Sequence, residues 1–530
     1  MAPFRHSKPD DDRESRSAGS NADSSISQHR FSEADERTRL LPPPAAGGFR
    51  GYLSPDDPAV SPYNLWGVRL LRYFTVLFTV ITFLWWVLLL VSIFVSPPGM
   101  HSRGSGFFDF SYTTLTLGLL LIVLLFFSSP SKAGQITCLV LAVILLIDMI
   151  IIVSVPRIRV EEGWVGIASV VWAVLMSMWT VFTDRTVQWG KREEEERLTG
   201  RQETRRTLRE WCSVLTSTVV LIFMALVGVL LTATLILRAR DASLPAPGDK
   251  YYVDGDKYQI HVFCEGNPTD SEGKKLPTVL FEAGDGPFEG GMIQIATNAL
   301  KNGSINRYCY ADRPGIGWSD NAPSPFSAAT AASVLSEALA RAGEEGPWVL
   351  ASAGVGSIYS RVFSSRHGME VSGLLLIDPL HEDLLYRIGK PGRGFLLWAW
   401  GVLSPLSLDR VPGAIFKGRT REDRVYGRSA YQNGRFIKAK LQESLVADSL
   451  TKDEVRSSRN IQLKDTPLAL ISSGVEIKKS TEWEEKQRDL SHLTNNLVSW
   501  DIVNKAPSEV WRTYSGIEII EKRLKELVHG

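Results

Sequence analysis

Five long apolar segments constrain the fold of this 530-residue chain more than any other feature of its sequence. A helix needs about 20 predominantly apolar residues to cross the hydrocarbon core of a bilayer, and each segment is close to that length. In lipid the backbone must satisfy its own hydrogen bonds, so all five are expected to be helices. They cover residues 67–95, 111–129, 136–155, 163–183 and 213–237. We therefore expect a multi-pass integral membrane protein with a five-helix transmembrane domain over residues 63–240, in contact with membrane lipids.

Residues 1–62 are rich in Ser, Asp, Arg, Gly and Pro and lack aliphatic clusters. Such a segment cannot bury enough apolar surface to offset its chain entropy, so a disordered cytosolic tail is expected. Within it, the run from Glu36 to Leu40 and Leu41 resembles an acidic dileucine sorting signal, which adaptor complexes read on cytosolic tails. The alternative is a chance match in a charged tail. The motif predicts a sorting adaptor as partner and a vacuolar or endosomal membrane as location.

The orientation of the helices follows from the distribution of basic residues, which favour the cytosolic side of a membrane. The loop at 184–212 carries eight Lys and Arg residues, whereas the loop at 96–110 carries only Arg103. With five spans, the N-terminal tail is then cytosolic and the C-terminal domain is lumenal or extracellular. Arg238 and Arg240, which follow the fifth span, argue weakly against this orientation.

Asp148 is the one ionisable residue deep in a predicted span. An intramembrane carboxylate is a candidate for proton relay or for binding a polar ligand. No predicted span carries a Lys or Arg that would pair with it. A protonated carboxyl group bonded to a neighbouring helix is the simpler interpretation, and a transporter-like role is the alternative.

Residues 250–530 have the composition of an α/β domain, in which short β-rich runs alternate with helical patterns. This alternation predicts a mainly parallel sheet covered by helices on both faces. The net charge of +1 gives no reason to expect a nucleic-acid partner. The four cysteines form no Cys-x-x-Cys pair, so neither a structural zinc site nor another metal or cofactor is expected.

Several motifs of this domain, in the same order, resemble the α/β-hydrolase superfamily. The run Thr278–Gly286 resembles the third strand with its oxyanion loop, and Tyr310–Asp320 resembles the turn after the fourth strand. The run Trp348–Arg361 resembles the fifth strand, nucleophile elbow and following helix, and Leu374–Asp383 resembles the sixth strand and its exit. The resemblance implies an α/β-hydrolase fold, with residues 384–465 inserted as a cap over the cleft.

The elbow, however, has no nucleophile. In the motif Gly-x-Ser-x-Gly the serine sits on a strained strand-to-helix turn. The corresponding run here is Ser352-Ala353-Gly354-Val355-Gly356, which places Gly354 at the nucleophile position. Glycine has no side chain with which to attack a carbonyl carbon.

The other triad positions are also incomplete. The region after the last predicted strand, residues 498–511, contains no histidine. Glu476 follows the seventh strand, where the acid of the superfamily often lies. A displaced nucleophile, Ser352 or Ser357, with His381 or His492 as general base, is an alternative. The small size of Ser352 and a helix N-terminal position for Ser357 are the simpler explanations of those two residues.

A surviving cleft would be lined by Gly284, Asp285, Gly286, Gly354 and Val355. An acidic residue in the oxyanion loop would oppose an oxyanion, which argues against acyl chemistry there. The resemblance also implies that the strands holding Cys264 and Cys309 are neighbours. These residues would form a disulfide in an oxidising lumen, or remain two buried thiols.

The leading hypothesis is a membrane-anchored pseudoenzyme that binds a lipid-like ligand or a partner protein. The alternatives are an active serine hydrolase on lipid or ester substrates and a transporter-like protein using Asp148. The architecture also resembles fungal multispan membrane proteins with such a domain, some of them described as mitochondrial. A mitochondrial membrane is therefore the alternative location, although the acidic residues of the tail do not fit a transit peptide.

Overall fold

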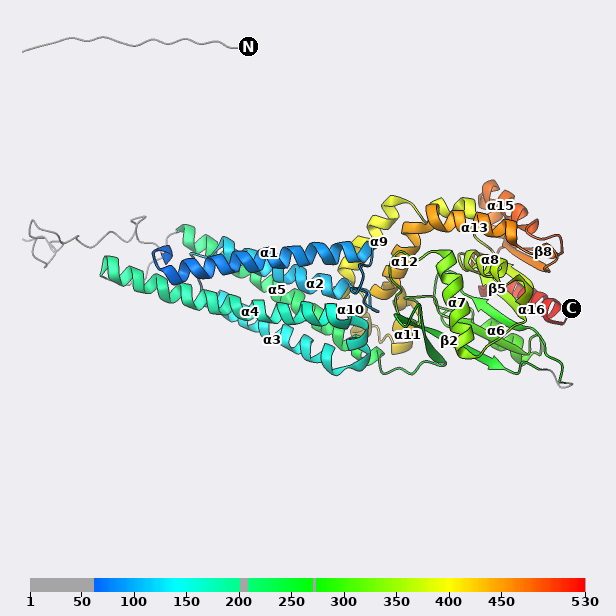
Figure 1. Cartoon of the computed structure of the whole chain (residues 1–530), viewed down its shortest axis with the longest axis horizontal. Coiled ribbons are helices and arrows are strands. Elements are labelled where there is room, and N and C mark those ends of the chain that lie inside the picture. Colours follow the sequence, from blue (N-terminus) through cyan, green and yellow to red (C-terminus); the bar gives the residue numbers. More distant parts are fainter. Residues whose placement is uncertain (1–61, 201–207, 270–272, 530) are drawn as a thin grey trace, which may run out of the picture. The chain divides into compact units, whose positions relative to one another are not determined.

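The computed structural model describes residues 62–200, 208–269 and 273–529. The dileucine motif at Glu36, Leu40 and Leu41 lies outside these residues, and so does nearly all of the expected tail. The described part of the chain consists of five long helices followed by a sheet domain (Figure 1).

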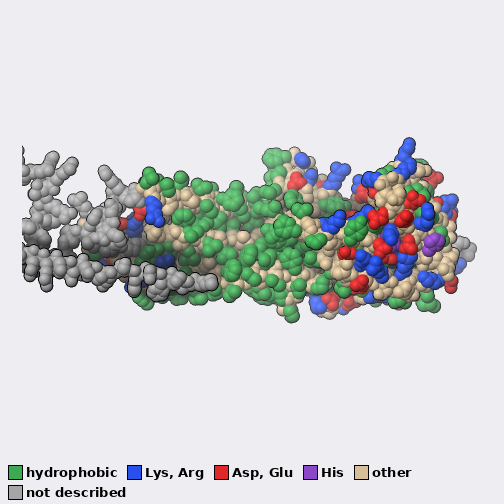
Figure 2. Space-filling model, turned by 90° about the horizontal axis from the view of Figure 1, so that it is seen from above, with side chains coloured by type: hydrophobic (Ala, Val, Ile, Leu, Met, Phe, Trp, Pro, Cys, Tyr) green, Lys and Arg blue, Asp and Glu red, His purple; other side chains and the backbone are tan. Residues whose placement is uncertain are grey.

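The five predicted spans are all helices long and apolar enough to cross a membrane. Many large apolar side chains on them face outward, and Figure 2 shows hydrophobic side chains covering this part of the surface while charged ones gather over the sheet domain. Outward apolar side chains are what a lipid environment requires. The helices are α1 (Trp66–Phe94), α2 (Phe107–Leu125), α3 (Lys132–Ser154), α4 (Pro156–Thr199) and α5 (Leu208–Asp241).

Helix α4 departs most from the sequence-based expectation, because it has 44 residues and continues to Thr199. Most of the predicted loop at 184–212 is therefore helical. The extension is rich in Glu, Lys and Arg, which favour helix, and Arg197 pairs with Glu194 at 3.1 Å. Near its other end, Gly163 (φ 63°) interrupts the regular helix with a kink. Hydropathy reports the thickness of the lipid core and not the end of the helix.

The sheet has eight strands in the order β1-β2-β4-β3-β5-β6-β7-β8. Strand β2 is antiparallel to its neighbours β1 and β4, and all the pairs from β4 to β8 are parallel. This order is that of the α/β-hydrolase fold, so the predicted fold class is confirmed. The strands are β1 (Asp249–Val253), β2 (Tyr258–Gly266), β3 (Thr278–Glu282), β4 (Arg307–Ala311), β5 (Trp348–Ala353), β6 (Val371–Ile377), β7 (Leu468–Ser473) and β8 (Leu497–Val503).

Helices cover both faces of the sheet, as Figure 1 shows. Helices α7 (Ala328–Ala342) and α8 (Gly356–Arg366) pack into the core on one face. Helices α6 (Ile293–Lys301) and α16 (Tyr514–His529) pack on the other. Between β7 and β8 lie α14 (Gly474–Lys479) and α15 (Thr481–Ser491). The buried aliphatic faces of both helix layers explain why the strands read as nearly continuous apolar runs.

The insertion between β6 and β7 is helical. It contains α9 (Pro391–Leu403), α10 (Arg410–Phe416), α11 (Arg421–Val425), α12 (Gly434–Val446) and α13 (Lys452–Ile461). Part of it contacts the membrane helices: Gly401 of α9 lies against Phe107 of α2. Leu397, Trp398 and Val402 of α9 pack against the same apolar cluster as Phe107.

Buried ion pairs join the membrane helices to the cap. Glu161 of α4 accepts from Arg238 of α5 at 2.8 Å and pairs with Arg435 of α12 at 3.4 Å. Asp241, the last residue of α5, pairs with Arg424 of α11 at 2.6 Å and with Arg410 of α10 at 3.3 Å. All six side chains are nearly or fully buried. We refer to these two clusters as the junction.

Candidate functional site

The turn between β5 and α8 has the geometry of a nucleophile elbow. Gly354, at its tip, has a left-handed backbone conformation with φ 49°. A Cβ added to Gly356 would lie 2.3 Å from the carbonyl oxygen of Ala283, so only glycine permits this approach of helix and strand. A Cβ added to Gly354 would meet only the Cα of Gly284, at 3.9 Å. The turn therefore has room for a side chain that the sequence does not supply.

Neither displaced-nucleophile candidate is poised for attack. Ser352 lies within β5, is fully buried, and its hydroxyl has no hydrogen-bond partner in the described part of the chain. Ser357 is also buried and donates to the carbonyl oxygen of Gly354 at 2.6 Å. The hydroxyl of Ser357 thus closes the first turn of α8, as expected of a residue at a helix N-terminus.

The two histidines considered as general bases lie elsewhere. His492 follows α15 and precedes β8, so it lies at the amino ends of the parallel strands, whereas Gly354 lies at a carboxyl end. The ring of His381 is held at both nitrogens: Nε2 is 2.7 Å from Asp489, and Nδ1 accepts from the backbone N–H of Asp383 at 3.0 Å. This leaves His381 no free nitrogen with which to take a proton from a serine.

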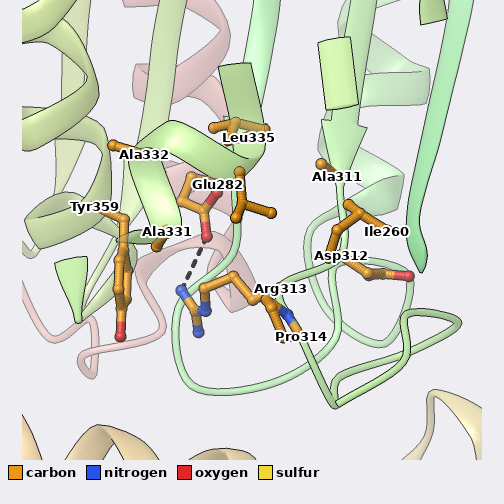
Figure 3. A pocket seen from close by; sticks show the side chains of 11 residues that line it. Ile260, Glu282, Ala311, Asp312, Arg313, Pro314, Ala331, Ala332, Leu335 and Tyr359 are labelled. Carbon is orange, nitrogen blue, oxygen red and sulfur yellow. Dashed lines mark hydrogen bonds and ion pairs between the residues drawn. The ribbon is translucent and has the colours of Figure 1, made fainter. Parts of the chain in front are cut away.

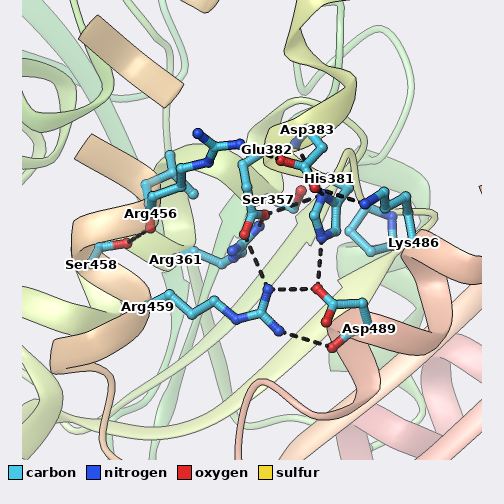
Figure 4. Close-up of polar contacts among 12 residues, drawn as sticks. Ser357, Arg361, His381, Glu382, Asp383, Arg456, Ser458, Arg459, Lys486 and Asp489 are labelled. Atoms are coloured by element: carbon cyan, nitrogen blue, oxygen red, sulfur yellow. Dashed lines mark hydrogen bonds and ion pairs between the residues drawn. The ribbon is translucent and has the colours of Figure 1, made fainter. Parts of the chain in front are cut away.

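His381 is part of an ion-pair cluster, drawn in Figure 4. Arg459 bridges Glu382 at 3.2 Å and Asp489 at 2.5 Å, and Arg361 pairs with Glu382 at 2.8 Å. His381, Glu382 and Asp489 are close enough to hold a metal ion together. The two guanidinium groups already neutralise these carboxylates, so the cluster is better explained as a structural link between α8, the exit of β6 and α15.

The acid candidate predicted from the sequence was Glu476, but a different carboxylate lies beside the segment after β8. Glu476 lies in α14 after β7 and pairs with Lys479 at 2.8 Å, and among the described residues no ion pair joins it to a histidine. Asp378, directly after β6, was not identified from the sequence. It is buried, has φ 42°, and accepts from the hydroxyl of Ser508 at 2.7 Å and from the indole of Trp483 at 3.2 Å. Burial raises the pKa of Asp378 to about 6.

Ser508 lies in the segment after β8, where the superfamily carries its histidine. The arrangement therefore keeps an acid beside that segment, with a hydroxyl group in place of an imidazole. The Asp-Pro pair at the exit of a predicted strand was the only sequence signal for Asp378, and the partner Ser508 is 130 residues away.

The oxyanion loop is held by a buried arginine. Arg313 pairs with Glu282 at 3.0 Å and donates to the carbonyl oxygens of Ala283 at 2.9 Å and Gly284 at 2.5 Å. Figure 3 shows its guanidinium group pointing toward Glu282, with the ring of Tyr359 nearby. Burial raises the pKa of Glu282 to about 7. The carbonyl groups of Ala283 and Gly284 thus accept hydrogen bonds from Arg313.

Side chains of the cap contact this loop. Lys440 of α12 pairs with Asp285 at 3.3 Å, and its ammonium group lowers the pKa of that carboxyl. The hydroxyl of Tyr431 lies against Gly286, and Trp511 lies near Gly284. The cavity beside Glu282 and Arg313 has a volume of only about 20 Å³, which is room for about one water molecule.

The intramembrane carboxylate is engaged within the bundle. Asp148 of α3 is fully buried, and the hydroxyl of Tyr112 on α2 donates to it at 3.1 Å. This contact joins the two neighbouring helices α2 and α3.

Cys264 and Cys309 lie opposite each other on β2 and β4, with 4.1 Å between their Cα atoms, and are joined by a disulfide. Cys138 and Cys212 are free thiols.

Comparisons with known proteins give relatives along most of the chain. A family model described as a region of unknown function (DUF2417) matches residues 36–264. An uncharacterised protein of Schizosaccharomyces pombe is 35% identical over 529 residues, covering 94% of this chain and 97% of that protein. An uncharacterised vacuolar membrane protein of Saccharomyces cerevisiae is 29% identical over 385 residues, covering 62% of this chain and 59% of that protein. This name and the five apolar helices confirm the expected multi-pass location in a vacuolar membrane.

Solved structures similar to the sheet domain have low sequence identity. The Cif epoxide hydrolase of Acinetobacter nosocomialis is 11% identical with a TM-score of 0.41, covering 57% of this chain and 96% of that chain. An α/β hydrolase enzyme from a Medee basin deep-sea metagenome library is 11% identical with a TM-score of 0.39, covering 53% and 96%.

Proposed function

Since the chain belongs to the fungal membrane-protein family that includes this Schizosaccharomyces pombe relative, we propose that its hydrolase-like domain is a non-catalytic binding domain held at the vacuolar membrane. Its ligand is a lipid-like molecule or a partner protein.

One observation carries this proposal: Gly354 occupies the tip of a well-formed elbow that has room for a side chain. If the turn itself had collapsed, the missing serine would be uninformative. Here the strained backbone and the close packing of Gly356 are kept while the reactive atom is absent. Nucleophilic catalysis needs a nucleophile beside a base, and the elbow provides neither.

The surroundings of the elbow support the same conclusion. Asp378 faces Ser508 instead of a histidine, and the carbonyl oxygen of Gly284 points at Arg313. An oxyanion hole requires N–H groups aimed at the developing charge. Tyr431 lies against Gly286 and Lys440 pairs with Asp285, so the cap contacts the loop that would border the cleft at Gly354 and Val355.

An active hydrolase with a displaced nucleophile remains the rival hypothesis. Ser352 and Ser357 would have to change partners, since one is enclosed in β5 and the other is bonded to Gly354. A transporter-like role of Asp148 is less well supported, because its carboxyl group already has Tyr112 as a partner.

The test is covalent labelling of the purified full-length protein in detergent with a fluorophosphonate probe, which reacts with activated serines. We expect no labelling of the folded protein, while an active serine hydrolase in the same detergent labels fully. Ser352→Ala and Ser357→Ala are the matched variants. Labelling that one of these substitutions removes would overturn the proposal and identify the nucleophile.

A further inference from the structure

A groove of about 460 Å³ lies at the β2–β4 edge of the sheet, and none of the cleft residues around Gly354 line it. Its walls come from β2, β4, α6, the start of α11 and the linker Leu244–Pro247, which follows α5. Figure 1 shows β2, α6 and α11 in the same part of the domain. This volume is within the range of small-molecule sites in proteins.

The pairing of β2 with β4 builds one wall of the groove. Phe263 lies opposite Tyr310, and Glu265 lies opposite Tyr308. Because side chains alternate along a strand, these four residues share one face of the sheet, and the disulfide of the intervening cysteines lies on the other. The ring centroid of Phe263 is 5.5 Å from that of Tyr310 and 6.2 Å from that of Tyr308. Tyr308 and Tyr310 are buried beside Phe263, so the partly exposed rings of Phe263 and Tyr426 form the aromatic surface of the groove.

Three glutamates, Glu265, Glu289 and Glu422, also line the groove, and no Lys or Arg does. Glu265 accepts from the hydroxyl of Tyr308 at 2.6 Å. Glu289 accepts from the hydroxyl of Tyr310 at 2.6 Å and from the indole of Trp318 at 2.9 Å. None of the three forms an ion pair with a cation in residues 62–200, 208–269 or 273–529. The hydrogen bonds from hydroxyl and indole groups hold the carboxylates of Glu265 and Glu289 in place without an ion pair.

We propose that this groove binds an organic cation with an ammonium group. Aromatic rings attract such cations through their negative faces, and carboxylates add direct charge attraction. The oxygens of the three glutamates do not all lie within 4.8 Å of one another, so they are too dispersed to coordinate a single metal ion. Trp318, Tyr308 and Tyr310 are buried, and the partly exposed rings of Phe263 and Tyr426 remain for the ligand.

The groove also lies next to the membrane helices. Leu244 is three residues beyond Asp241, the last residue of α5. The ammonium group can therefore come from a lipid headgroup or from a free amine. The inference does not depend on whether the elbow is catalytic.

The experiment follows the thermal unfolding of the full-length protein in dodecylmaltoside, which has no cationic group. Choline is the free probe, and dihexanoylphosphatidylcholine below its critical micelle concentration is the lipid probe. Dihexanoylphosphatidylglycerol, whose anionic headgroup has no ammonium group, is the control lipid. We expect a saturable rise in the midpoint with one or both cationic probes. Saturation with choline identifies a free cation as sufficient, and saturation with the lipid alone identifies a headgroup.

Two variants and a control decide where the cation binds. The first variant is Glu289→Gln. The second combines Glu265→Gln and Glu422→Gln at the more exposed rim. We expect each variant to weaken the apparent affinity for the cationic probe at least tenfold. Glu484→Gln, at an exposed i,i+4 pair on α15, should leave the affinity unchanged. The inference is overturned if no probe gives a saturable shift, or if both folded groove variants respond like the control.

Discussion

Gly354 has a backbone conformation that other L-residues adopt at a cost, yet the space beyond its Cα is open. We expect Gly354→Ser to fold and to lose about 1 kcal/mol of stability, the cost of a left-handed conformation. The restored serine should still resist fluorophosphonate, because the loop after β8 supplies Ser508 and no imidazole. Thermal midpoints and probe labelling measure both effects.

The matched variant is Gly356→Ser, whose Cβ would lie 2.3 Å from a backbone oxygen. We expect it to be far more damaging than Gly354→Ser, with a loss above about 3 kcal/mol, the scale of severe overpacking. Equal losses at the two positions would show that the turn is not the rigid elbow described above.

Asp378 should make the stability of the domain depend on pH. Burial raises its pKa from 3.8 to about 6, so the folded state holds this proton more tightly than the unfolded state. Stability from this group is fully present below about pH 4 and is lost as pH rises to about 6. Two pKa units correspond to about 3 kcal/mol. Asp378→Asn should flatten this part of the profile of thermal midpoint against pH, and an unchanged profile would contradict the assignment.

Among individual residues, Gly354 and the residues of the cleft were identifiable from the sequence, because the elbow motif consists of consecutive residues. The sequence did not identify Asp378, whose partners Ser473, Trp483 and Ser508 come from three later segments. Nor did it show that His381 is bonded at both nitrogens. Such contacts depend on where the sheet brings distant residues together.

The helices and strands were more predictable than their ends. All five spans and seven of the eight strands are recognisable from apolar runs, but β1 is too polar and short to stand out. Helix α2 begins at Phe107, four residues before the predicted span, and α4 continues 16 residues past the predicted one. The α4 extension lies where charged residues continue the helix beyond the lipid core, whereas the α2 extension consists of three phenylalanines and Asp109.

The junction predicts how the bundle and cap depend on each other. Glu161→Gln would leave Arg238 and Arg435 buried with less compensating charge. Breaking one member of a buried pair costs about 3–5 kcal/mol. We expect a clear fall in the thermal midpoint in detergent. The control is Arg488→Met, at an exposed pair with Glu484, which should cost less than about 1 kcal/mol. Similar effects of both variants would show that the junction does not stabilise the protein.

For the whole molecule, the distribution of basic residues in the sequence predicts which side of the membrane each end of the chain faces. The arrangement of the helices does not determine this topology. If the segment before α5 is cytosolic, Cys212 faces the cytosol, and its side chain is exposed. In intact vacuoles, a membrane-impermeant maleimide should label the wild-type protein and not Cys212→Ser. Labelling that requires permeabilised membranes would reverse the orientation and place the sheet domain in the cytosol.

The junction also bears on how such a chain can evolve. Glu161 and Arg435 are 274 positions apart, yet each neutralises the other. A gene that lost its second half would leave Asp241 without Arg410 and Arg424, its partners in the cap, and a swapped second half would supply the wrong partners. Selection should therefore oppose both fission and shuffling at this boundary, so the membrane part and the hydrolase-like part are expected to share a single line of descent.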